Sequence, residues 1–197
     1  MMLDVPTPDG ATEALLSAAE LRAWVREVPD FPKPGIQFKD ITPLLREPRA
    51  FRSAIEHMAE AIREMKPDLL VGVEARGFLF AAALGLRLRL GIAPVRKPGK
   101  LPWRSVSESY ALEYGSDALH LHEDAIAAGS RVVIVDDVLA TGGTAAAVSR
   151  LVRKLSGVVS GFSFFLELGN LGGRAKLPPI PVHSLLTYGS ETDSTRL

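Results

Sequence analysis

The sequence predicts an α/β protein built on a doubly wound, mostly parallel sheet, with a small N-terminal hood region and an added hairpin. Two observations support this prediction. Segments of strand-like and helical character alternate from residue 51 to residue 168, as expected for strands joined by crossover helices. The run from Leu69 to Val73 contains no polar residue, which indicates a strand buried inside a sheet.

Length and composition are those of an ordinary globular chain. The 197 residues favour a single domain around one core. The 23 basic residues balance the 23 acidic residues, so the strong positive field of a general nucleic-acid binder is missing. The chain has no cysteine, which excludes disulfides, thiolate zinc sites and cysteine nucleophiles.

We expect a cytoplasmic protein that partners neither nucleic acid nor membrane. The opening residues, MMLDVPTPDG, lack the basic and apolar regions of a secretory signal. No apolar run approaches the ~20 residues that a membrane helix needs. We expect one domain over residues 1–197, with a loose terminus at 1–15, an N-terminal region at about 16–45 and a core at about 48–190.

The N-terminal region shows one helix and one irregular segment. Ser17 and Glu20 have the spacing of a capping box. Apolar residues then recur at helical spacing from Leu21 to Val28, which predicts a short amphipathic helix. The stretch FPKPGIQFKDITPLL, residues 31–45, contains three Pro or Gly residues near its start and predicts a structured loop or irregular strand.

The core begins with a helix that starts at Pro48 and ends before Pro67, because one apolar stripe runs through it. The strand at 69–73 follows, and then a helix over about 78–88 and a strand over 92–95. A polar loop is expected at 96–109, followed by a hairpin of 110–114 and 119–123. A strand, turn and helix begin at Val132, and two more strands are expected at 158–168 and 182–188.

The stretch VVIVDDVLATGGTAAA, residues 132–147, carries the clearest chemical signal. Backbone N–H groups at Gly142 and Gly143 and the hydroxyls of Thr141 and Thr144 can bind an anion at the start of a helix. The lysine of a nucleotide phosphate loop is absent, which favours a phosphate that is held but not transferred. The cradle comprises Ala140, Thr141, Gly142, Gly143 and Thr144.

Two carboxylates, Asp136 and Asp137, directly precede this cradle. Carboxylates only accept hydrogen bonds, so hydroxyls and cations are their natural partners. A phosphate cradle beside acceptors for a diol fits a ribose 5-phosphate. The structural alternative is a plain strand, turn and helix with aspartate caps. Three further loops could reach the same edge of the sheet: 74–77, 96–109 and the GNLGGR turn after Leu168.

The same stretch resembles the phosphoribosyl pyrophosphate signature of the type I phosphoribosyltransferases. FPKPGIQFKDITPLL, EARGFLFAAALGL, VRKPGKLP and YALEYG are similar, in order and spacing, to segments of the adenine phosphoribosyltransferases. Together they span about residues 29–188. The signature alone indicates only the superfamily, whereas YALEYG and FPKPG point to adenine.

The resemblance implies transfer of a phosphoribosyl group from 5-phosphoribosyl 1-pyrophosphate to N9 of adenine, which gives AMP and pyrophosphate in purine salvage. It implies Mg²⁺ held mainly through substrate, with no metal ligand directly from the protein. It also implies a homodimer and a non-proline cis peptide at Glu74–Ala75. The departing pyrophosphate needs cations and donors, and the candidates are Ala75, Arg76, Gly77, Lys97 and Lys100.

By the same resemblance Glu113 is the catalytic residue, which manages the proton on the imidazole edge of adenine. Adenine would lie between Phe38 and Leu168, with backbone groups of Gln37 and Lys39 reading its amino edge. Residue 37 is aliphatic in the expected pattern, so glutamine makes the pocket rim more polar. Residues 98–110 would form a lid that excludes water. For each group an ordinary surface or core role is the structural alternative.

Three other functions compete with this one. The same superfamily includes enzymes for xanthine, for hypoxanthine and guanine, and for orotate. A purine-sensing regulator would bind phosphoribosyl pyrophosphate without turnover, but it would need a DNA-binding helix pair and a basic face. A metal-dependent phosphotransfer domain using Asp136 and Asp137 would need a lysine that the signature lacks.

We predict that Glu113→Ala preserves the fold but lowers kcat by about 10²–10⁴, the range that a positioned acid–base group contributes. Steady-state kinetics and thermal unfolding of the variant test this. Turnover close to wild type would exclude the assigned role.

Overall fold

The computed structural model describes residues 14–112 and 115–189, and the chain divides into two compact units, Met1–Ser53 and Ala54–Leu197. We call them the N-terminal unit and the core unit. The N-terminal unit holds α1 (Ala18–Leu21), the 3₁₀ turn η1 (Arg22–Trp24), β1 (Arg26–Val28), β2 (Phe38–Asp40) and α2 (Thr42–Arg46). Helix α3 (Pro48–Glu64) begins in it and continues into the core unit. The predicted loose terminus at 1–15 lies almost entirely outside the described residues.

The start of the N-terminal unit confirms the predicted capping box and corrects the predicted helix. The Ser17 hydroxyl accepts from Glu20 N–H, and the Glu20 carboxylate accepts from Ser17 N–H. The helix does not continue to Val28. It ends at Leu21 and tightens into η1, and Val28 then pairs with Phe38 in an antiparallel ladder. β-Branched valines favour the extended conformation that such pairing supplies.

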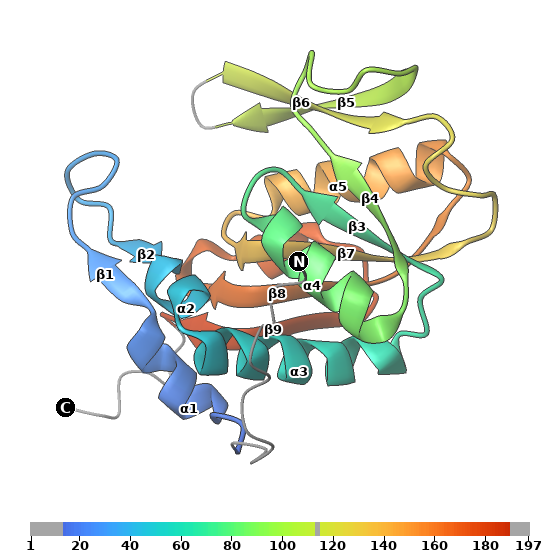
Figure 1. Ribbon diagram of the computed structural model, residues 1–197. Helices are drawn as coiled ribbons and strands as arrows, with labels where there is room; N and C mark the ends of the chain where they lie inside the picture. Colours follow the sequence, from blue (N-terminus) through green and yellow to red (C-terminus); the bar gives the residue numbers. More distant parts are fainter. Residues whose placement is uncertain (1–13, 113–114, 190–197) are drawn as a thin grey trace, which may run out of the picture. The chain divides into compact units, whose positions relative to one another are not determined.

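The core unit contains one parallel sheet of five strands in the order β4-β3-β7-β8-β9 (Figure 1). The strands are β3 (Leu69–Val73), β4 (Gly91–Val95), β7 (Arg131–Leu139), β8 (Val158–Leu168) and β9 (Val182–Tyr188). Numbered along the chain the order is 2-1-3-4-5, a doubly wound arrangement. The predicted bounds of β3, β8 and β9 agree with the structure to the residue.

Helices cover both faces of this sheet, and strand β8 shows the division. Phe165 stacks on Phe80 of α4 (Gly77–Leu88) with ring centroids 5.5 Å apart. Phe162 and Phe164 belong instead to the apolar cluster formed with α5 (Gly143–Lys154). Successive residues of a strand point to opposite faces, so α4 and α5 lie on opposite sides. The predicted fold class is confirmed.

A two-stranded antiparallel hairpin, β5 (Ser105–Leu112) with β6 (Gly115–His122), is added to the core unit. The Glu108 carboxylate accepts from Arg150 Nε at 2.5 Å and pairs with Lys154 Nζ at 2.5 Å, which ties β5 to α5. Lys154 first and Arg150 next lower the pKa of Glu108, against the opposing effect of burial. These two ion pairs therefore hold the hairpin against α5.

The hairpin corrects the predicted loop at 96–109. The loop ends at Arg104, because residues 105–112 pair with residues 115–122. The expected lid at 98–110 therefore includes six residues, 105–110, that belong to β5. Among the residues that the structure describes, no helix has the length and apolar character to cross a membrane.

Candidate active site

Two loops meet where the winding of the sheet reverses. Strands β3 and β7 are neighbours, but the connections that leave them lead to opposite sides of the sheet, to β4 and to β8. Ligands of open α/β sheets bind at the carboxyl ends of strands at such a point. Residues 74–77 follow β3 and residues 136–144 end β7 and lead into α5, so the structure brings together two of the loops that the sequence indicated.

The loop after β3 is held to the loop after β4 by Glu74. Its carboxylate accepts from Lys97 N–H at 2.9 Å and from Arg96 Nη2 at 3.2 Å. The Lys97 hydrogen bond is the main cause that lowers the pKa of Glu74, and Arg96 adds to it. The peptide bond between Glu74 and Ala75 is cis, as expected. The two basic candidates, Lys97 and Lys100, have exposed side chains beside this link.

Close packing joins the first turn of α4 to the end of β7. A Cβ atom on Gly77 would lie 2.7 Å from Oδ1 of Asp136 and 3.1 Å from the carbonyl oxygen of Val135. Only glycine fits this contact. Next to it, Arg76 Nε lies 2.7 Å from Oδ2 of Asp137, an ion pair whose carboxylate side chain is 7% exposed. Among the residues that the structure describes, none donates a hydrogen bond to that carboxylate oxygen, so the contact with Arg76 is one of charge.

The carboxylates of Asp136 and Asp137 lie close together in a largely buried site. Burial raises the pKa of Asp136 well above its ordinary value, and the carboxylate of Asp137 raises it further. Burial also raises the pKa of Asp137, and the charge of Arg76 opposes that shift. Asp136 keeps part of its surface exposed to the pocket formed by the next loop. A cation or hydroxyl donor bound there would relieve this electrostatic cost.

The loop after Asp137 forms a small pocket at the N-terminus of α5. It has a volume of about 80 Å³, far below the roughly 300–1,000 Å³ of a site for a drug-sized ligand, so it fits a group rather than a whole nucleotide. Gly142 caps the helix with φ +76°, a left-handed conformation that glycine adopts without strain. The lining residues include all five predicted cradle residues: Ala140, Thr141, Gly142, Gly143 and Thr144.

The expected adenine contacts belong to different units. Phe38 and Lys39 lie in β2 and Gln37 directly precedes it, all in the N-terminal unit, whereas Leu168 ends β8 in the core unit. The two sides of the expected pocket therefore come from different units, and their pairing stays a prediction. Lys39 Nζ also pairs with the carboxylate of Glu27, across the β1–β2 ladder.

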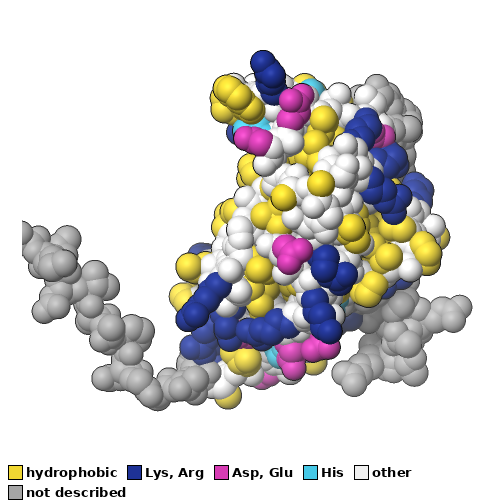
Figure 2. Space-filling view, turned by 90° about the vertical axis from the view of Figure 1, so that its right-hand side faces the viewer, with side chains coloured by type: hydrophobic (Ala, Val, Ile, Leu, Met, Phe, Trp, Pro, Cys, Tyr) yellow, Lys and Arg dark blue, Asp and Glu magenta, His cyan; other side chains and the backbone are white. Residues whose placement is uncertain are grey.

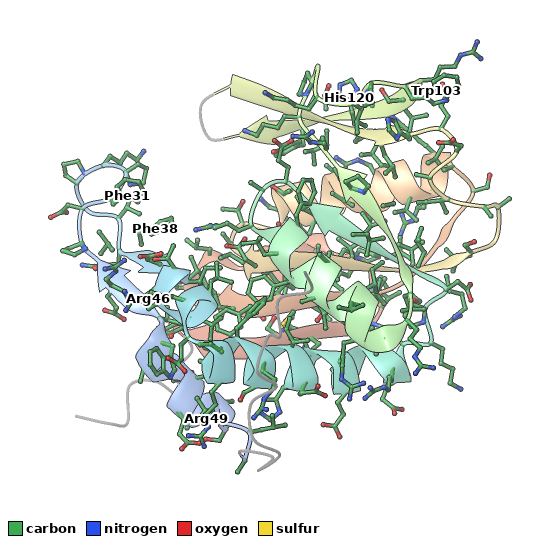
Figure 3. All side chains as sticks on the ribbon, viewed as in Figure 1. Phe31, Phe38, Arg46, Arg49, Trp103 and His120 are labelled. Atoms are coloured by element: carbon green, nitrogen blue, oxygen red, sulfur yellow. The ribbon has the colours of Figure 1, made fainter. Side chains whose placement is uncertain are left out.

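Phe31 is a residue that the sequence reasoning did not assign to the site. Its ring meets that of Phe38 edge-on within the N-terminal unit, with centroids 5.1 Å apart and planes at 76° (Figure 3). The contact is made by a loop that folds back between Phe31 and Phe38, with Gly35 N–H donating to Asp30 at 2.7 Å. The signal that could have found it is the FPKPG stretch, which Phe31 opens and which points to adenine by resemblance.

Glu113 lies outside the described residues, so its role stays a prediction. His120 accepts or donates a hydrogen bond at 3.2 Å to Ser105 within the hairpin, and GNLGGR forms two 3₁₀ turns, η2 (Gly169–Leu171) and η3 (Gly173–Lys176). Within residues 14–112 and 115–189, no three His, Asp or Glu side chains gather as metal ligands.

Comparison with known proteins identifies the family. The family model for the phosphoribosyl transferase domain matches residues 41–158. Adenine phosphoribosyltransferases from Desulfitobacterium hafniense (strain Y51) and Synechococcus sp. (strain JA-3-3Ab) are 53% and 57% identical to the chain. These matches cover 88% and 85% of the chain, and 100% and 97% of the relatives. The chain belongs to the adenine phosphoribosyltransferase family.

Solved structures of the adenine phosphoribosyltransferase family agree. The enzyme from Thermoanaerobacter pseudethanolicus is 51% identical, with a TM-score of 0.85 over 87% of this chain and 100% of that chain. The enzyme from Saccharomyces cerevisiae, solved with adenine and an imino-altritol bisphosphate, is 46% identical, with a TM-score of 0.81 over 86% of this chain and 98% of that chain. The family and the fold expected from the sequence are both confirmed.

The raised pKa of Asp136 predicts that its ionised carboxylate lowers the stability of the fold while it contributes to substrate binding. The folded chain retains a proton on Asp136 at pH values where the unfolded chain has lost it. The free energy of unfolding should therefore fall as pH rises from the ordinary carboxyl range through the raised pKa. Asp136→Asn cannot ionise, so its Tm should exceed that of wild type above this range, by roughly 2–4 °C per kcal/mol relieved.

The same variant should bind phosphoribosyl pyrophosphate about 10–100-fold more weakly, since a charged hydrogen bond is worth about 1.5–3 kcal/mol. Thermal unfolding from pH 4 to pH 8 and substrate titration measure the two effects. Asp124→Asn, the same change at an exposed position, is the matched control. A Tm difference that does not grow with pH would contradict the assignment.

Proposed function

We propose that this chain transfers the phosphoribosyl group of 5-phosphoribosyl 1-pyrophosphate to N9 of adenine, releasing AMP and pyrophosphate. It is then a pentosyltransferase of purine salvage. One observation carries the proposal: in a chain of the adenine phosphoribosyltransferase family, a phosphate cradle and a carboxylate pair lie together at the β3–β7 switch point. Such a site suits a sugar phosphate whose 5-phosphate is held while chemistry occurs at C1.

In the reaction the bond between C1 and the pyrophosphate oxygen breaks, and its electron pair leaves with pyrophosphate. The bond between N9 and C1 forms, and the imidazole proton of adenine passes to a base. The ribose carries oxocarbenium character between these events, as in glycoside cleavage. The protein must therefore fix the sugar, neutralise the leaving group, manage one proton and exclude water.

We assign the sugar to the end of β7. Gly142, Gly143 and the first N–H groups of α5 would bind the 5-phosphate, with the hydroxyls of Thr141 and Thr144, and Ala140 shaping the turn. The carboxylates of Asp136 and Asp137 would accept from the ribose hydroxyls. The crowding that raises their pKa values supports this role, because donors or cations supplied by substrate stabilise the ionised pair.

We assign the pyrophosphate to the turn after β3 and to the basic loop. Ala75, Arg76 and Gly77 would present donors beside the end of β7, and Lys97 and Lys100 would supply positive charge. The Glu74 carboxylate supports this arrangement, because it fixes Lys97 N–H and Arg96 while the Lys97 side chain remains exposed. Arg76 has a second task, since it balances the charge of Asp137.

Mg²⁺ fits this site as an ion carried mainly by substrate. The two adjacent carboxylates are the described acidic groups at the sugar site, and two are too few to enclose a cation. Mg²⁺ commonly binds through one or two carboxylates plus substrate phosphates and water. When bound, it would neutralise charge on the departing pyrophosphate. Asp136 and Asp137 would hold it indirectly, through the ribose hydroxyls that they bind.

We assign adenine to Phe38 and Leu168, with the backbone of Gln37 and Lys39 at its amino edge, and the proton to Glu113. The edge-on contact of Phe31 with Phe38 supports the role of Phe38 in binding adenine, because it limits the tilt of the Phe38 ring. Loop 96–104 would exclude water from the reacting carbon. Most residues of this loop are exposed, including Trp103 with 64% exposure, so little packing would oppose a movement of the loop over a bound substrate.

We also propose a homodimer and a cytoplasmic location. Helix α4 and edge strand β4 carry three exposed apolar side chains, Leu79, Leu86 and Ile92, and Ile92 also lines an apolar pocket of about 180 Å³. Apolar surface of this kind favours burial against a second copy. The cytoplasm is where a polyanionic substrate made by the cell would be retained, since membranes exclude multiple charges.

A regulator that binds phosphoribosyl pyrophosphate without turnover is the alternative from another class. The surface does not favour a nucleic-acid partner. Lys and Arg side chains are prominent on the face drawn in Figure 2, but acidic side chains lie among them. This agrees with the balance of 23 basic and 23 acidic residues. Enzymes of the superfamily that act on other bases remain the nearer alternative.

Incubation of the chain with adenine, phosphoribosyl pyrophosphate and Mg²⁺ should form AMP and pyrophosphate in equal amounts. Parallel reactions with hypoxanthine, guanine, xanthine and orotate should form at least about 10²-fold less product, since a site that hydrogen-bonds one edge of a base rejects analogues with unmatched groups. Chromatography of the nucleotides measures both. Absence of AMP, or preference for another base, would overturn the proposal.

A further inference from the structure

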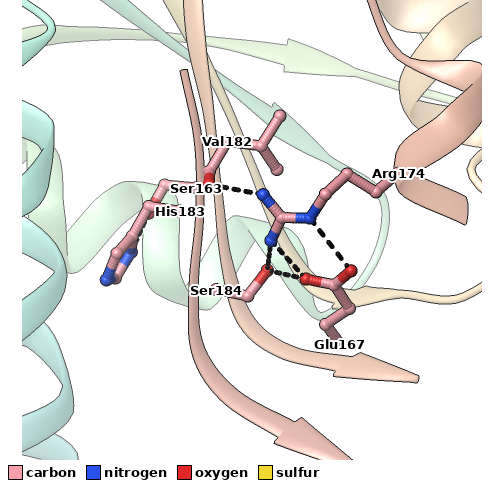
Figure 4. A network of polar contacts seen from close by, with 6 residues as sticks. All are labelled: Ser163, Glu167, Arg174, Val182, His183 and Ser184. Carbon is pink, nitrogen blue, oxygen red and sulfur yellow. Dashed lines mark hydrogen bonds and ion pairs between the residues drawn. The ribbon is translucent and has the colours of Figure 1, made fainter. Parts of the chain in front are cut away.

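Arg174 is the centre of a polar network in the core unit that the proposed chemistry does not use (Figure 4). Its Nε donates to Glu167 Oε1 at 3.2 Å and its Nη2 to Oε2 at 2.5 Å, a two-point contact with one carboxylate. Its Nη1 donates to the carbonyl oxygen of Val182 at 2.8 Å. The hydroxyl of Ser184 donates to Glu167 Oε2 at 2.7 Å. One side chain thus joins three segments: η3, β8 and β9.

The network is built on a buried carboxylate at the end of β8. The side chain of Glu167 is 9% exposed, whereas that of Arg174 is 49% exposed. Burial alone would raise the pKa of Glu167, but the hydrogen bonds from Arg174 and Ser184 outweigh it and hold the pKa below its usual value. The carboxylate is therefore ionised at neutral pH and grips the guanidinium in a fixed orientation.

Gly173, the residue before Arg174, packs directly against the phosphate cradle. A Cβ atom on Gly173 would lie 2.0 Å from the carbonyl oxygen of Ala140 and 2.8 Å from the backbone nitrogen of Gly142. A Cβ atom on Gly142 would lie 2.2 Å from the carbonyl oxygen of Gly173. The backbones of Gly142 and Gly173 are therefore in direct contact, and Gly142 is the residue that caps α5 in a left-handed conformation.

We propose that Arg174 and Glu167 are positioning residues for the phosphate cradle, acting through the backbone contact of Gly173 with Ala140 and Gly142. The inference rests on the proposed function for the identity of the bound phosphate. Glu167 fixes the orientation of the Arg174 side chain, and Arg174 in turn links η3 to β8 and β9. Gly173 of η3 then contacts the backbone of the cradle at Ala140 and Gly142. Neither side chain is a catalytic residue.

This support matters because the geometry of the cradle backbone determines how well the cradle binds a phosphate. It lacks the lysine that fixes the phosphate in nucleotide-binding loops, so its affinity depends on the convergence of backbone N–H groups. Those groups diverge if Gly142 moves. A misplacement of about 1 Å can cost about 10²-fold in rate, even when it originates away from the chemistry.

The first test removes the network. Arg174→Met, Glu167→Gln and the double variant are compared with Lys176→Met, which removes a charge from an exposed position in the same turn. We expect Arg174→Met to weaken ribose 5-phosphate binding, measured by calorimetry, about 10–100-fold and to raise the KM for phosphoribosyl pyrophosphate similarly. The double variant should lose little more than either single variant, because the two residues act as a unit.

The second test changes the backbone contact alone. Gly173→Ala places its methyl group against backbone atoms, whereas Gly172→Ala has a positive φ of +62° but meets nothing within 4 Å. The Gly173 variant should show the same loss of ribose 5-phosphate affinity as Arg174→Met, and the Gly172 variant should stay within about threefold of wild type. If Gly173→Ala does not fold, Arg174→Met and Glu167→Gln decide the question.

All binding is measured at least 20 °C below the Tm of each variant, so that unfolding does not reduce the active fraction. A purely structural network would lower Tm and leave the ribose 5-phosphate Kd unchanged, and that result would overturn the proposal. The comparison does not require turnover. If wild type formed no AMP, the proposed function would fail, while the ribose 5-phosphate affinities would still test the positioning role.

Discussion

The parallel pairing of β3 with β7 is the constraint on which the candidate site depends. It sets the two loop ends side by side and lets the first turn of α4 approach the end of β7. Gly77 leaves just enough space for Asp136, and Arg76 balances the charge of the neighbouring Asp137. The connection after β3 leads to β4 and the connection after β7 leads to β8, in opposite directions along the sheet. A crevice in which a ligand can bind therefore remains between the two loops.

The electrostatics of this edge show why function works against stability here. The carboxylates of Asp136 and Asp137 are adjacent and largely buried, and the guanidinium of Arg76 compensates only part of their charge. A folded chain without a ligand therefore retains an unfavourable interaction that a sugar diol and a substrate-bound cation would relieve. Strain of this kind is commonly concentrated at functional sites and is compensated by packing elsewhere, in this case by a sheet covered on both faces.

Local sequence signals predicted most of the core unit. The bounds of β3 followed from an uninterrupted apolar run, and those of β8 and β9 from longer, largely apolar stretches that a few polar residues interrupt. The cradle at 140–144 followed from residues adjacent in the chain. The sequence misassigned segments whose conformation depends on distant partners. Val28 is extended because it pairs with Phe38, and the polar run Ser105–Ser109 is a strand because β6 lies beside it.

The same distinction separates the candidate site residues that the sequence singled out from those that it did not. Asp136 and Thr141 were identified because the motif that contains them is continuous. The support from Gly173 was not predictable, since it joins residues about thirty positions apart and depends on the length of β8. The role of Glu74 as a link to Arg96 and Lys97 likewise required the β3–β4 pairing to be known.

The central claim is that the β3–β7 switch point binds the sugar phosphate through its 5-phosphate end. A crystal structure of the chain with phosphoribosyl pyrophosphate and Mg²⁺, without adenine, tests it most directly. We expect the 5-phosphate within hydrogen-bonding distance of residues 141–144, the ribose hydroxyls at Asp136 and Asp137, and pyrophosphate beside residues 75–77. A 5-phosphate bound at residues 75–77, or away from both loops, would contradict it.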